Sequence, residues 1–229
     1  MFVAFTTVQV LWVRFLPPLT TLTIESRRLE SILAGKGWSI DRSWVDRDEV
    51  SDAVVKAVLA GEDYLFWDHH GFDWKAIRKA REWNARPENK RRGRLHGAST
   101  LTQQVAKNVF LWQGRSWLRK GLEAWYTTLL ELLVPKERIL VLYLNVAEWG
   151  DRVFGVEAAC LRTFKKHAKV ASRHESAVLA SSLPNPRKYP PWSGADWRTR
   201  REAKIAGRMA SIDAVDPDED AKIDADDDE

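Results

Sequence analysis

The sequence predicts a single, mainly α-helical domain with a short appendage at each end. A chain of 229 residues is the usual size of one domain, and 45% hydrophobic residues are enough for a real core. Apolar side chains recur at three- and four-residue spacings, the period of a helix with one buried face. Strand-like alternation is scarce, and the sequence contains no internal repeat.

The first stretch, residues 2–16, is mostly apolar and ends at two prolines. A membrane-spanning helix needs about 20 apolar residues, whereas this stretch is shorter and contains Gln9 and Arg14. It also lacks the basic leader and the small-residue cleavage site of a signal peptide. Taken alone, it is interpreted as an amphipathic segment that lies on a bilayer or packs on the domain.

The elements that follow are predicted from periodicity and from glycine and proline. Residues 20–44 are polar and predict irregular structure. A helix over residues 50–60 has Val54 and Val58 on its apolar side and ends at Gly61. Further helices are expected over residues 74–83, 101–111, 118–133, 135–144, 153–163, 174–182 and 196–209. Between them, we expect a basic loop over residues 84–96 and an extended proline-rich segment over residues 184–191.

Charge is distributed unevenly along the chain. The net charge is +4, but ten of the residues from Ile212 to Glu229 are acidic and only one is basic. This end lacks aromatics and helical periodicity, so residues 210–229 are predicted to be a disordered acidic tail. The rest of the chain is strongly basic, which suits phospholipid headgroups, a diphosphate or nucleic acid. Cys160 is the only cysteine, which excludes an internal disulfide.

One block of acidic and aromatic residues directly follows the helix that is expected to end at Gly61. It reads Glu-Asp-x-x-Phe-x-x-His-x-Gly-Phe-Asp and begins at Glu62. Tyr64, Phe66 and Trp67 lie close to Glu62 in sequence. Aromatic neighbours can desolvate a carboxylate and raise its pKa towards the value that a general base or acid needs. We therefore regard Glu62 as a candidate general acid or base.

The other polar residues of this block have a structural interpretation. Asp63 and Asp73 would cap turns, and His69 would be a hydrogen-bonded structural residue. His69 and His70 are not interpreted as a metal pair, because adjacent side chains point apart and no second cluster of ligands is evident.

A second block begins at Ser99 and is typical of a helix start that binds phosphate. Thr100 and Gln103 fit a capping box, and the free amides at a helix N-terminus attract phosphate. Three- and four-residue spacings predict one polar face on this helix, made of Gln103, Gln104, Lys107 and Asn108.

The same block supplies cations and a second carboxylate. When a diphosphate leaves a sugar, charge develops on its phosphate oxygens, and fixed cations stabilise that charge. The available cations are Lys107, Arg115, Arg119 and Lys120. Glu123 lies four residues after Arg119, so the two could form a simple surface ion pair. Alternatively, Glu123 orients the cations or holds a divalent ion against a diphosphate.

The order and spacing of the two blocks resemble the peptidoglycan glycosyltransferases (glycosyltransferase family 51), and among them the single-domain, monofunctional biosynthetic transglycosylases. The resemblance covers residues 16–209 and continues through Tyr143-Leu144-Asn145. Val141 is a departure, because many members have glutamate there. We expect Asn145, Glu148 and Glu157 to be architectural rather than catalytic.

The resemblance implies a lysozyme-like helical bundle with an active-site cleft over residues 20–209. It implies that residues 1–19 are the remnant of an N-terminal membrane anchor. It also implies that Glu62 is the base that deprotonates the acceptor sugar and that Glu123 is a second essential glutamate. The positions that would contact the donor diphosphate or the neighbouring sugar are Ser99, Gln104, Lys107, Arg115, Arg119 and Lys120.

The implied activity is polymerisation of lipid II into glycan strands, with inversion at the anomeric carbon and release of undecaprenyl diphosphate. The implied partners are lipid II, undecaprenyl-diphosphate-linked glycan, the membrane, and transpeptidases or other cell-wall synthases, but not nucleic acid. The implied location is the outer, periplasmic face of the cytoplasmic membrane. No cofactor is expected to be required. Two alternatives stay open at Glu123, namely a stimulating Mg²⁺ or Mn²⁺ ion, or lysine and arginine partners alone.

Two other classes of protein share part of this pattern. A lysozyme-like peptidoglycan hydrolase or lytic enzyme also uses a glutamate in an α-rich cleft, but it has no need of the clustered cations. A non-enzymatic basic module that binds membrane or nucleic acid would be indifferent to Glu62→Gln. The sequence shows no zinc-ligand spacing, aromatic RNA-binding signature or dinucleotide loop to support nucleic-acid binding.

Overall fold

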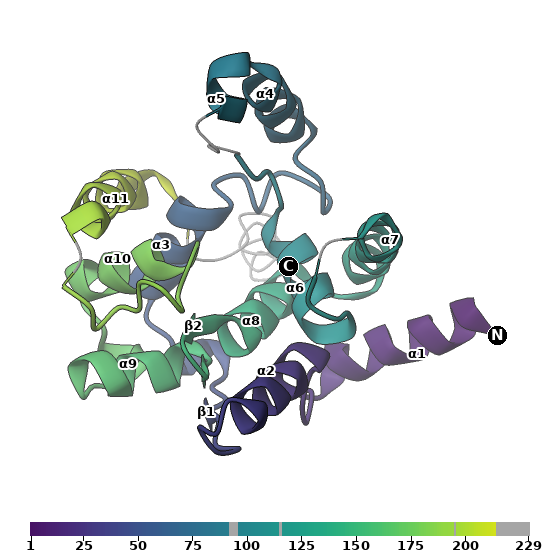
Figure 1. The fold of residues 1–229 in the computed structure, drawn as a ribbon, viewed down its shortest axis with the longest axis horizontal. Helices are drawn as coiled ribbons and strands as arrows, with labels where there is room; N and C mark the ends of the chain where they lie inside the picture. The colour runs from purple at the N-terminus through teal and green to yellow at the C-terminus, as the bar shows by residue number, and fades with distance from the viewer. Residues whose placement is uncertain (92–95, 115, 195, 214–229) are drawn as a thin grey trace, which may run out of the picture.

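Helices make up most of the structure, as the sequence predicts (Figure 1). The structure is a computed structural model, and it describes residues 1–91, 96–114, 116–194 and 196–213. The predicted site residue Arg115 and residues 214–229 of the predicted tail lie outside these described residues. The first residues of that predicted tail are described: Met209–Ser211 is a 3-10 helix and Ile212 is 6% exposed.

The helices and strands follow one another along the chain in a mainly helical order. They are α1 (Phe2–Phe15), α2 (Leu22–Leu33), β1 (Asp41–Arg42), η1 (Arg47–Glu49), α3 (Asp52–Glu62), α4 (Trp74–Ala85), α5 (Pro87–Arg91), α6 (Leu101–Phe110), α7 (Trp117–Leu133), α8 (Lys136–Val146), β2 (Glu148–Gly150), β3 (Val153–Phe154), α9 (Val156–Phe164), η2 (Ala168–Val170), α10 (Arg173–Ser182), α11 (Asp196–Arg208) and η3 (Met209–Ser211).

The core is built around α8, whose residues from Ile139 to Val146 are all buried. A helix that is hydrophobic on every side belongs in the interior. Helix α6 packs on α8 and α7, while α3 packs on α10, and α10 on α11. Val141, the departure from the family pattern, is part of this core and is 6% exposed. An apolar side chain therefore suits that position.

A small sheet joins the N-terminal segment to the middle of the chain. Strand β1 pairs in parallel with β3, which pairs antiparallel with β2. Beside it, Asn145 donates to the Val45 carbonyl oxygen (2.8 Å) and accepts from the Val45 amide (2.9 Å). Glu157 accepts a hydrogen bond from the Ala168 amide (2.8 Å). Both side chains thus make the structural contacts expected of architectural residues.

Gly155 lies at the point where the sheet passes into α9. Its φ is +86°, and a Cβ there would lie 2.8 Å from the Ser43 carbonyl oxygen. We expect Gly155→Ala to lower the free energy of unfolding by about 2 kcal/mol, because both the backbone angle and this contact become unfavourable. Urea denaturation measures the change.

The matched control for that substitution is Gly121→Ala on α7. No atom lies within 4 Å of a Cβ at Gly121, and alanine favours a helix interior over glycine. The control should therefore be neutral or slightly stabilising. Equal stability of Gly155→Ala and wild type would contradict this account of the junction.

Two boundary predictions are wrong for identifiable reasons. Residues 20–44 are not irregular throughout, since they contain α2, whose buried residues are Thr23, Ile24, Arg27 and Ser31. A mostly polar buried face gives no apolar stripe to detect. Helix α3 does not end at Gly61 but continues to Glu62. A Cβ at Gly61 would lie 3.2 Å from Ile205, so this glycine allows α11 to pack closely instead of ending α3.

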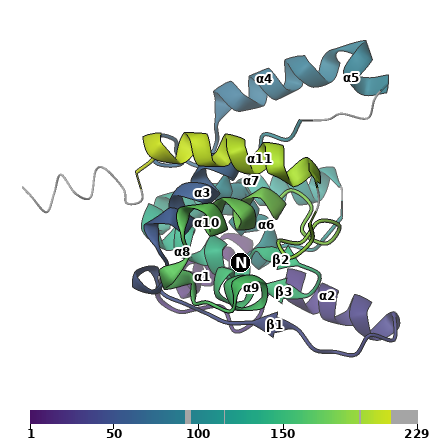
Figure 2. The ribbon, with the colours of Figure 1, turned by 90° about the vertical axis from the view of Figure 1, so that its left-hand side faces the viewer.

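Two further predictions need correction between α4 and α9. The basic stretch expected to be a loop contains α5, which begins with a proline, and proline suits the first turn of a helix. The segment expected to be one helix over residues 153–163 is β3 followed by α9. Helices α4 and α5 form an arm that stands apart from the other helices in both views (Figures 1 and 2).

Helix α1 packs on α7 through one side and leaves the other side open. Its buried residues are Thr6, Val10 and Val13. Trp125 Nε1 donates to Thr6 Oγ1 (3.1 Å), which ties the two helices together. Within the described residues, no helix has both the length and the apolar character needed to span a membrane.

Candidate active site

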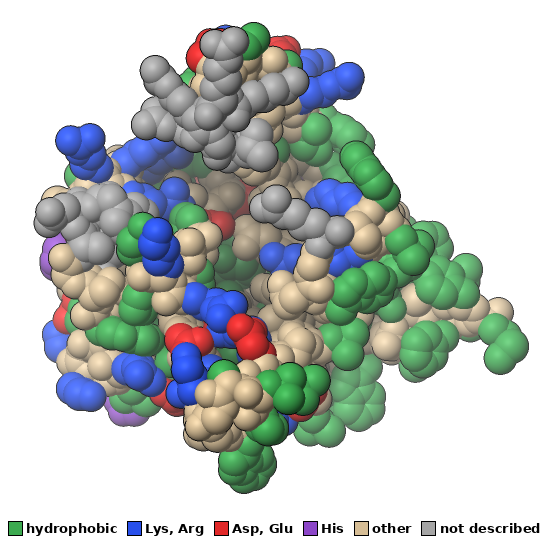
Figure 3. Space-filling model, viewed as in Figure 1, with side chains coloured by type: hydrophobic (Ala, Val, Ile, Leu, Met, Phe, Trp, Pro, Cys, Tyr) green, Lys and Arg blue, Asp and Glu red, His purple; other side chains and the backbone are tan. Residues whose placement is uncertain are grey.

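Two cavities open beside α6, in the hollowed face seen in Figure 3 between the arm of α4 and α5 and helix α2. The first cavity has a volume of about 460 Å³, and its lining includes Glu62, Ser99, Lys79 and Arg208. The second has a volume of about 370 Å³, and its lining includes Gln104, Lys107, Asn108, Tyr143 and Glu148. Of the predicted site residues, Glu62 and Ser99 line the first cavity and Gln104 and Lys107 line the second, whereas Arg119 and Lys120 line a separate pocket.

Glu62 connects the linings of the two cavities through a hydrogen bond. Its Oε2 accepts a hydrogen bond from Gln104 Nε2 (3.0 Å), and its Oε1 lies 2.9 Å from Arg201 Nη2. Glu62 lines the first cavity and Gln104 the second, so their hydrogen bond marks the boundary. The carboxylate therefore borders the first cavity and is also held to α6 through Gln104.

The surroundings of Glu62 favour a proton-accepting role. Burial raises the pKa of this carboxyl group above its ordinary value, while the Gln104 hydrogen bond and the Arg201 charge counteract part of that effect. The aromatic environment predicted from the sequence is present only in part. Phe66 is fully buried in the core, and only Tyr64 of the three expected aromatics lines the first cavity. The burial that raises the pKa of Glu62 therefore does not come only from the three aromatic residues expected from the sequence.

Asp63, His69 and Asp73 have the structural roles that the sequence predicts. Asp63 Oδ2 accepts from the Leu101 amide at the start of α6 (2.7 Å). His69 Nε2 lies 2.9 Å from Asp63 Oδ1. Asp73 caps α4 by accepting from the Ala76 amide (2.7 Å). The bond between Asp63 and Leu101 is one of the contacts that join the first sequence block to the second.

The predicted capping box at the start of α6 is confirmed. The Thr100 side chain accepts from the Gln103 amide, and Gln103 Oε1 accepts from the Thr100 amide (3.0 Å). Thr100 Oγ1 also donates to the Gly71 carbonyl oxygen (2.6 Å). Gln103, one member of the predicted polar face, is consequently 4% exposed. Ser99, directly before the cap, remains accessible to the first cavity.

Glu123 is surrounded by the predicted cations. Its Oε2 lies 2.8 Å from Arg119 Nη1, and its Oε1 contacts Lys120 Nζ. The side chains of Glu123 and Arg119 are 4% and 12% exposed, so the pair is buried and the surface ion-pair interpretation is wrong. Burial lowers the pKa of Lys107, and the charge of Glu123 opposes that shift more than any other group. Lys107 therefore also interacts electrostatically with Glu123.

A metal site is not evident around these carboxylates. The described residues contain no group of three or more histidine, cysteine, aspartate or glutamate side chains that could hold a metal ion. Both oxygens of Glu123 already contact cations.

Arg201 and Tyr143 are residues of the site that the sequence does not reveal. Arg201 comes from α11, far along the chain from Glu62, and no local pattern signals their contact. Burial raises the pKa of Tyr143 well above its usual value, and the charge of Glu62 adds to this. The sequence places Tyr143 in a motif but gives no sign of its position in the cleft.

The contact between Arg201 and Glu62 predicts how the pH dependence of turnover changes when Arg201 is replaced. The Arg201 charge lowers the pKa of Glu62, so Arg201→Gln should raise that pKa further. A base works only when deprotonated, so if Glu62 is the base that the resemblance implies, the acidic limb of the kcat/KM profile should move to higher pH. The pH profile of turnover measures the shift. Lys204→Gln removes a charge from an exposed position on the same helix and should leave the limb in place; an unmoved limb in Arg201→Gln would contradict the assignment.

Comparisons with known proteins relate the chain to one family. A family model described as transglycosylase matches residues 30–210. A biosynthetic peptidoglycan transglycosylase of Xanthomonas campestris pv. campestris (strain B100) is 49% identical over 207 residues, which is 90% of this chain and 82% of the relative. Proteins of the same name from Pseudomonas fluorescens (strain SBW25) and Stutzerimonas stutzeri (strain A1501) are 48% and 45% identical, covering 86% and 92% of this chain and 79% and 85% of their own lengths.

Proposed function

Because the chain belongs to the transglycosylase family and is a peptidoglycan glycosyltransferase, we propose that it polymerises lipid II, with inversion at the anomeric carbon and release of undecaprenyl diphosphate. The observation that carries this proposal is the position of Glu62, a buried carboxylate with a raised pKa that connects the linings of two cavities. Such a position can bring two substrates together at one base.

The two cavities fit the two substrates in a definite order. Lipid II, the acceptor, occupies the first cavity, so that its 4-hydroxyl reaches Glu62. The growing strand, the donor, occupies the second cavity, with its diphosphate at Lys107. Glu62 takes the proton of the 4-hydroxyl, and the oxygen attacks the anomeric carbon from the face opposite the diphosphate. The bond to the diphosphate breaks as the new β bond forms.

The cations around Glu123 take the place of the general acid that a hydrolase needs. Lys107, Arg119 and Lys120 stabilise the negative charge that develops on the leaving diphosphate. Arg115 is assigned to the same group from the resemblance, and Ser99 and Gln104 to contacts with the neighbouring sugar. Glu123 keeps the cations in place, because it is buried between them. A divalent ion at Glu123 would have to displace one of these partners, so we propose that the reaction needs none.

The site of action is the outer face of the cytoplasmic membrane. Peptidoglycan synthesis belongs to the cell envelope, and exposed apolar side chains gather along α1 (Figure 3). They are Phe2, Val3, Phe5, Val8, Leu11, Trp12 and Phe15. Trp117 and Leu118, at the start of the neighbouring helix α7, are also exposed. Apolar and tryptophan side chains of this kind suit insertion at the bilayer interface.

The proposal is tested by incubating the protein with labelled lipid II in detergent and resolving the products by size. We expect lipid-linked glycan polymer with β linkages. A folded protein that makes no polymer, and instead releases short soluble fragments from preformed glycan, would identify a hydrolase and overturn the proposal.

A further inference from the structure

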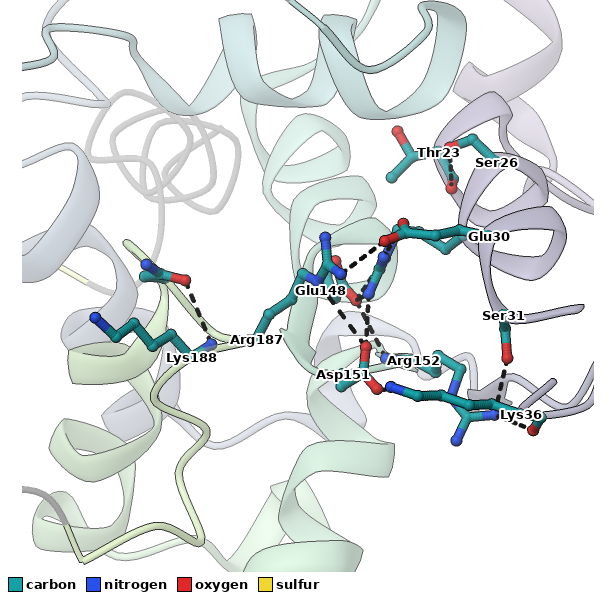
Figure 4. A network of polar contacts seen from close by, with 12 residues as sticks. Thr23, Ser26, Glu30, Ser31, Lys36, Glu148, Asp151, Arg152, Arg187 and Lys188 are labelled. Atoms are coloured by element: carbon teal, nitrogen blue, oxygen red, sulfur yellow. Dashed lines mark hydrogen bonds and ion pairs between the residues drawn. The ribbon is translucent and has the colours of Figure 1, made fainter. Parts of the chain in front are cut away.

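A network of ion pairs that the transfer step does not use (Figure 4) contributes several residues to the lining of the second cavity, namely Arg27, Glu30, Glu148 and Arg187. At its centre is Arg27 of α2, whose side chain is 6% exposed. Arg27 contacts Glu30, Glu148 (3.0 Å) and Asp151 (2.7 Å). Arg187, which follows α10 in the chain, contacts Glu30 (2.8 Å). The network therefore joins α2, strand β2 and the proline-rich segment.

Glu148 differs from the other acids of the network because its two oxygens have different surroundings. Oε1 accepts from Arg27 Nε (3.0 Å) and from the Arg152 amide (3.1 Å). No described residue donates a hydrogen bond to Oε2, yet Glu148 lines the second cavity and its side chain is only 15% exposed. One oxygen is thus fixed, and the other is available to a ligand in the cavity.

Other residues in the lining of the second cavity carry groups that can bind a sugar. Gln104, Asn108 and Gln113 each carry a carboxamide, which can donate and accept hydrogen bonds. An ionised carboxylate only accepts, so Glu148 would select a ligand group that donates. A sugar hydroxyl or an acetamide N–H is such a group, whereas a phosphate oxygen is not.

We propose that Glu148 is a substrate-binding residue for the donor strand, whose Oε2 accepts a hydrogen bond from a sugar unit in the second cavity. This inference rests on the proposed function, which places the donor there. Lys107 and Glu148 then set the orientation of the donor strand in the second cavity, because Lys107 binds the diphosphate and Glu148 binds the neutral sugars. Arg27 is the positioning residue that holds Glu148 in place.

The test is Glu148→Gln, with Asp151→Asn as the matched control. The Arg27 and Arg152 donors will hold the new carbonyl oxygen, which turns the amide NH₂ towards the cavity and replaces an acceptor with a donor at nearly constant shape. Asp151 contacts the same arginine and is 41% exposed. It does not line the second cavity, so Asp151→Asn removes one charge from the network without changing the proposed contact.

The measurements are the dissociation constant and the transfer kinetics of a lipid-linked tetrasaccharide whose terminal 4-hydroxyl is blocked, so that it acts only as a donor. We expect Glu148→Gln to weaken donor binding and raise the donor KM at least tenfold, with kcat and the acceptor KM within twofold of wild type. Asp151→Asn should stay within twofold throughout. Donor binding that is equal in Glu148→Gln and Asp151→Asn would overturn the inference.

A second variant covers the case in which Glu148→Gln does not fold. Glu148→Asp keeps the charge opposite Arg27 but withdraws the carboxylate by one methylene, so it should also weaken donor binding. Unchanged donor binding in a folded Glu148→Asp would contradict the inference. Wild-type protein that binds the donor but does not transfer it would contradict the proposed function alone, because donor binding does not depend on turnover.

Discussion

Glu62→Gln is expected to lower the rate of glycan polymerisation by roughly 10²–10⁴-fold, the contribution of a positioned general base. Glutamine keeps the shape of the side chain and can still pair with Gln104, so the fold and substrate binding should change little. What is lost is a buried carboxylate that lines the first cavity and whose pKa is raised by burial. Size-resolved products from labelled lipid II measure the loss.

The control for this variant is Glu82→Gln, which removes a carboxylate from an exposed position on α4. It should polymerise like wild type. Thermal unfolding of both variants shows whether the fold is retained. A folded Glu62→Gln protein that keeps more than about a tenth of wild-type turnover would mean that another group is the base.

Lys107→Met should lower kcat by roughly 10²–10³-fold, the usual loss when one group that stabilises transition-state charge is removed. The expected physical cause is the loss of a fixed cation beside the leaving diphosphate. Glu123 still contacts Arg119 and Lys120 in this variant, so its buried charge remains compensated and the protein should fold. Separate assays with a donor-only substrate and with lipid II as acceptor measure the effect.

The loss in Lys107→Met should fall on the donor. Lys169→Met removes a lysine from an exposed position on η2 and controls for the change in overall charge. Equal weakening of donor and acceptor binding in Lys107→Met would show that this lysine does not belong to the diphosphate site.

The part of the candidate site that contains Glu62 and Thr100 can be predicted from the sequence, because each of its two sequence blocks can be recognised from neighbouring residues alone. The capping box at Thr100 and Gln103 is read within four residues, and the structure forms it as expected. One contact between the two blocks, from Asp63 to the Leu101 amide, spans 38 residues. No local pattern reports it, although the sequence predicts a helix before Asp63 and another that begins at Leu101.

The parts of the site that the sequence does not predict depend on tertiary contacts of polar side chains. Arg201 reaches Glu62 from 139 residues away. Helix α2 escapes prediction because its buried face carries Arg27 and other polar groups instead of an apolar stripe. The interpretation of Glu148 as architectural describes its bond to Arg27 but not its place in the lining of the second cavity.

The central claim, that Glu62 is the base, is tested most directly by the pH dependence of transfer in a single turnover, compared between wild type and Glu62→Gln. Burial raises the pKa of Glu62, so the wild-type rate should fall as the pH drops through a value above the ordinary range of a carboxylate. The slow residual rate of Glu62→Gln should show no such fall. An acidic limb that persists at the same pH in Glu62→Gln would contradict the account, since it would belong to another group.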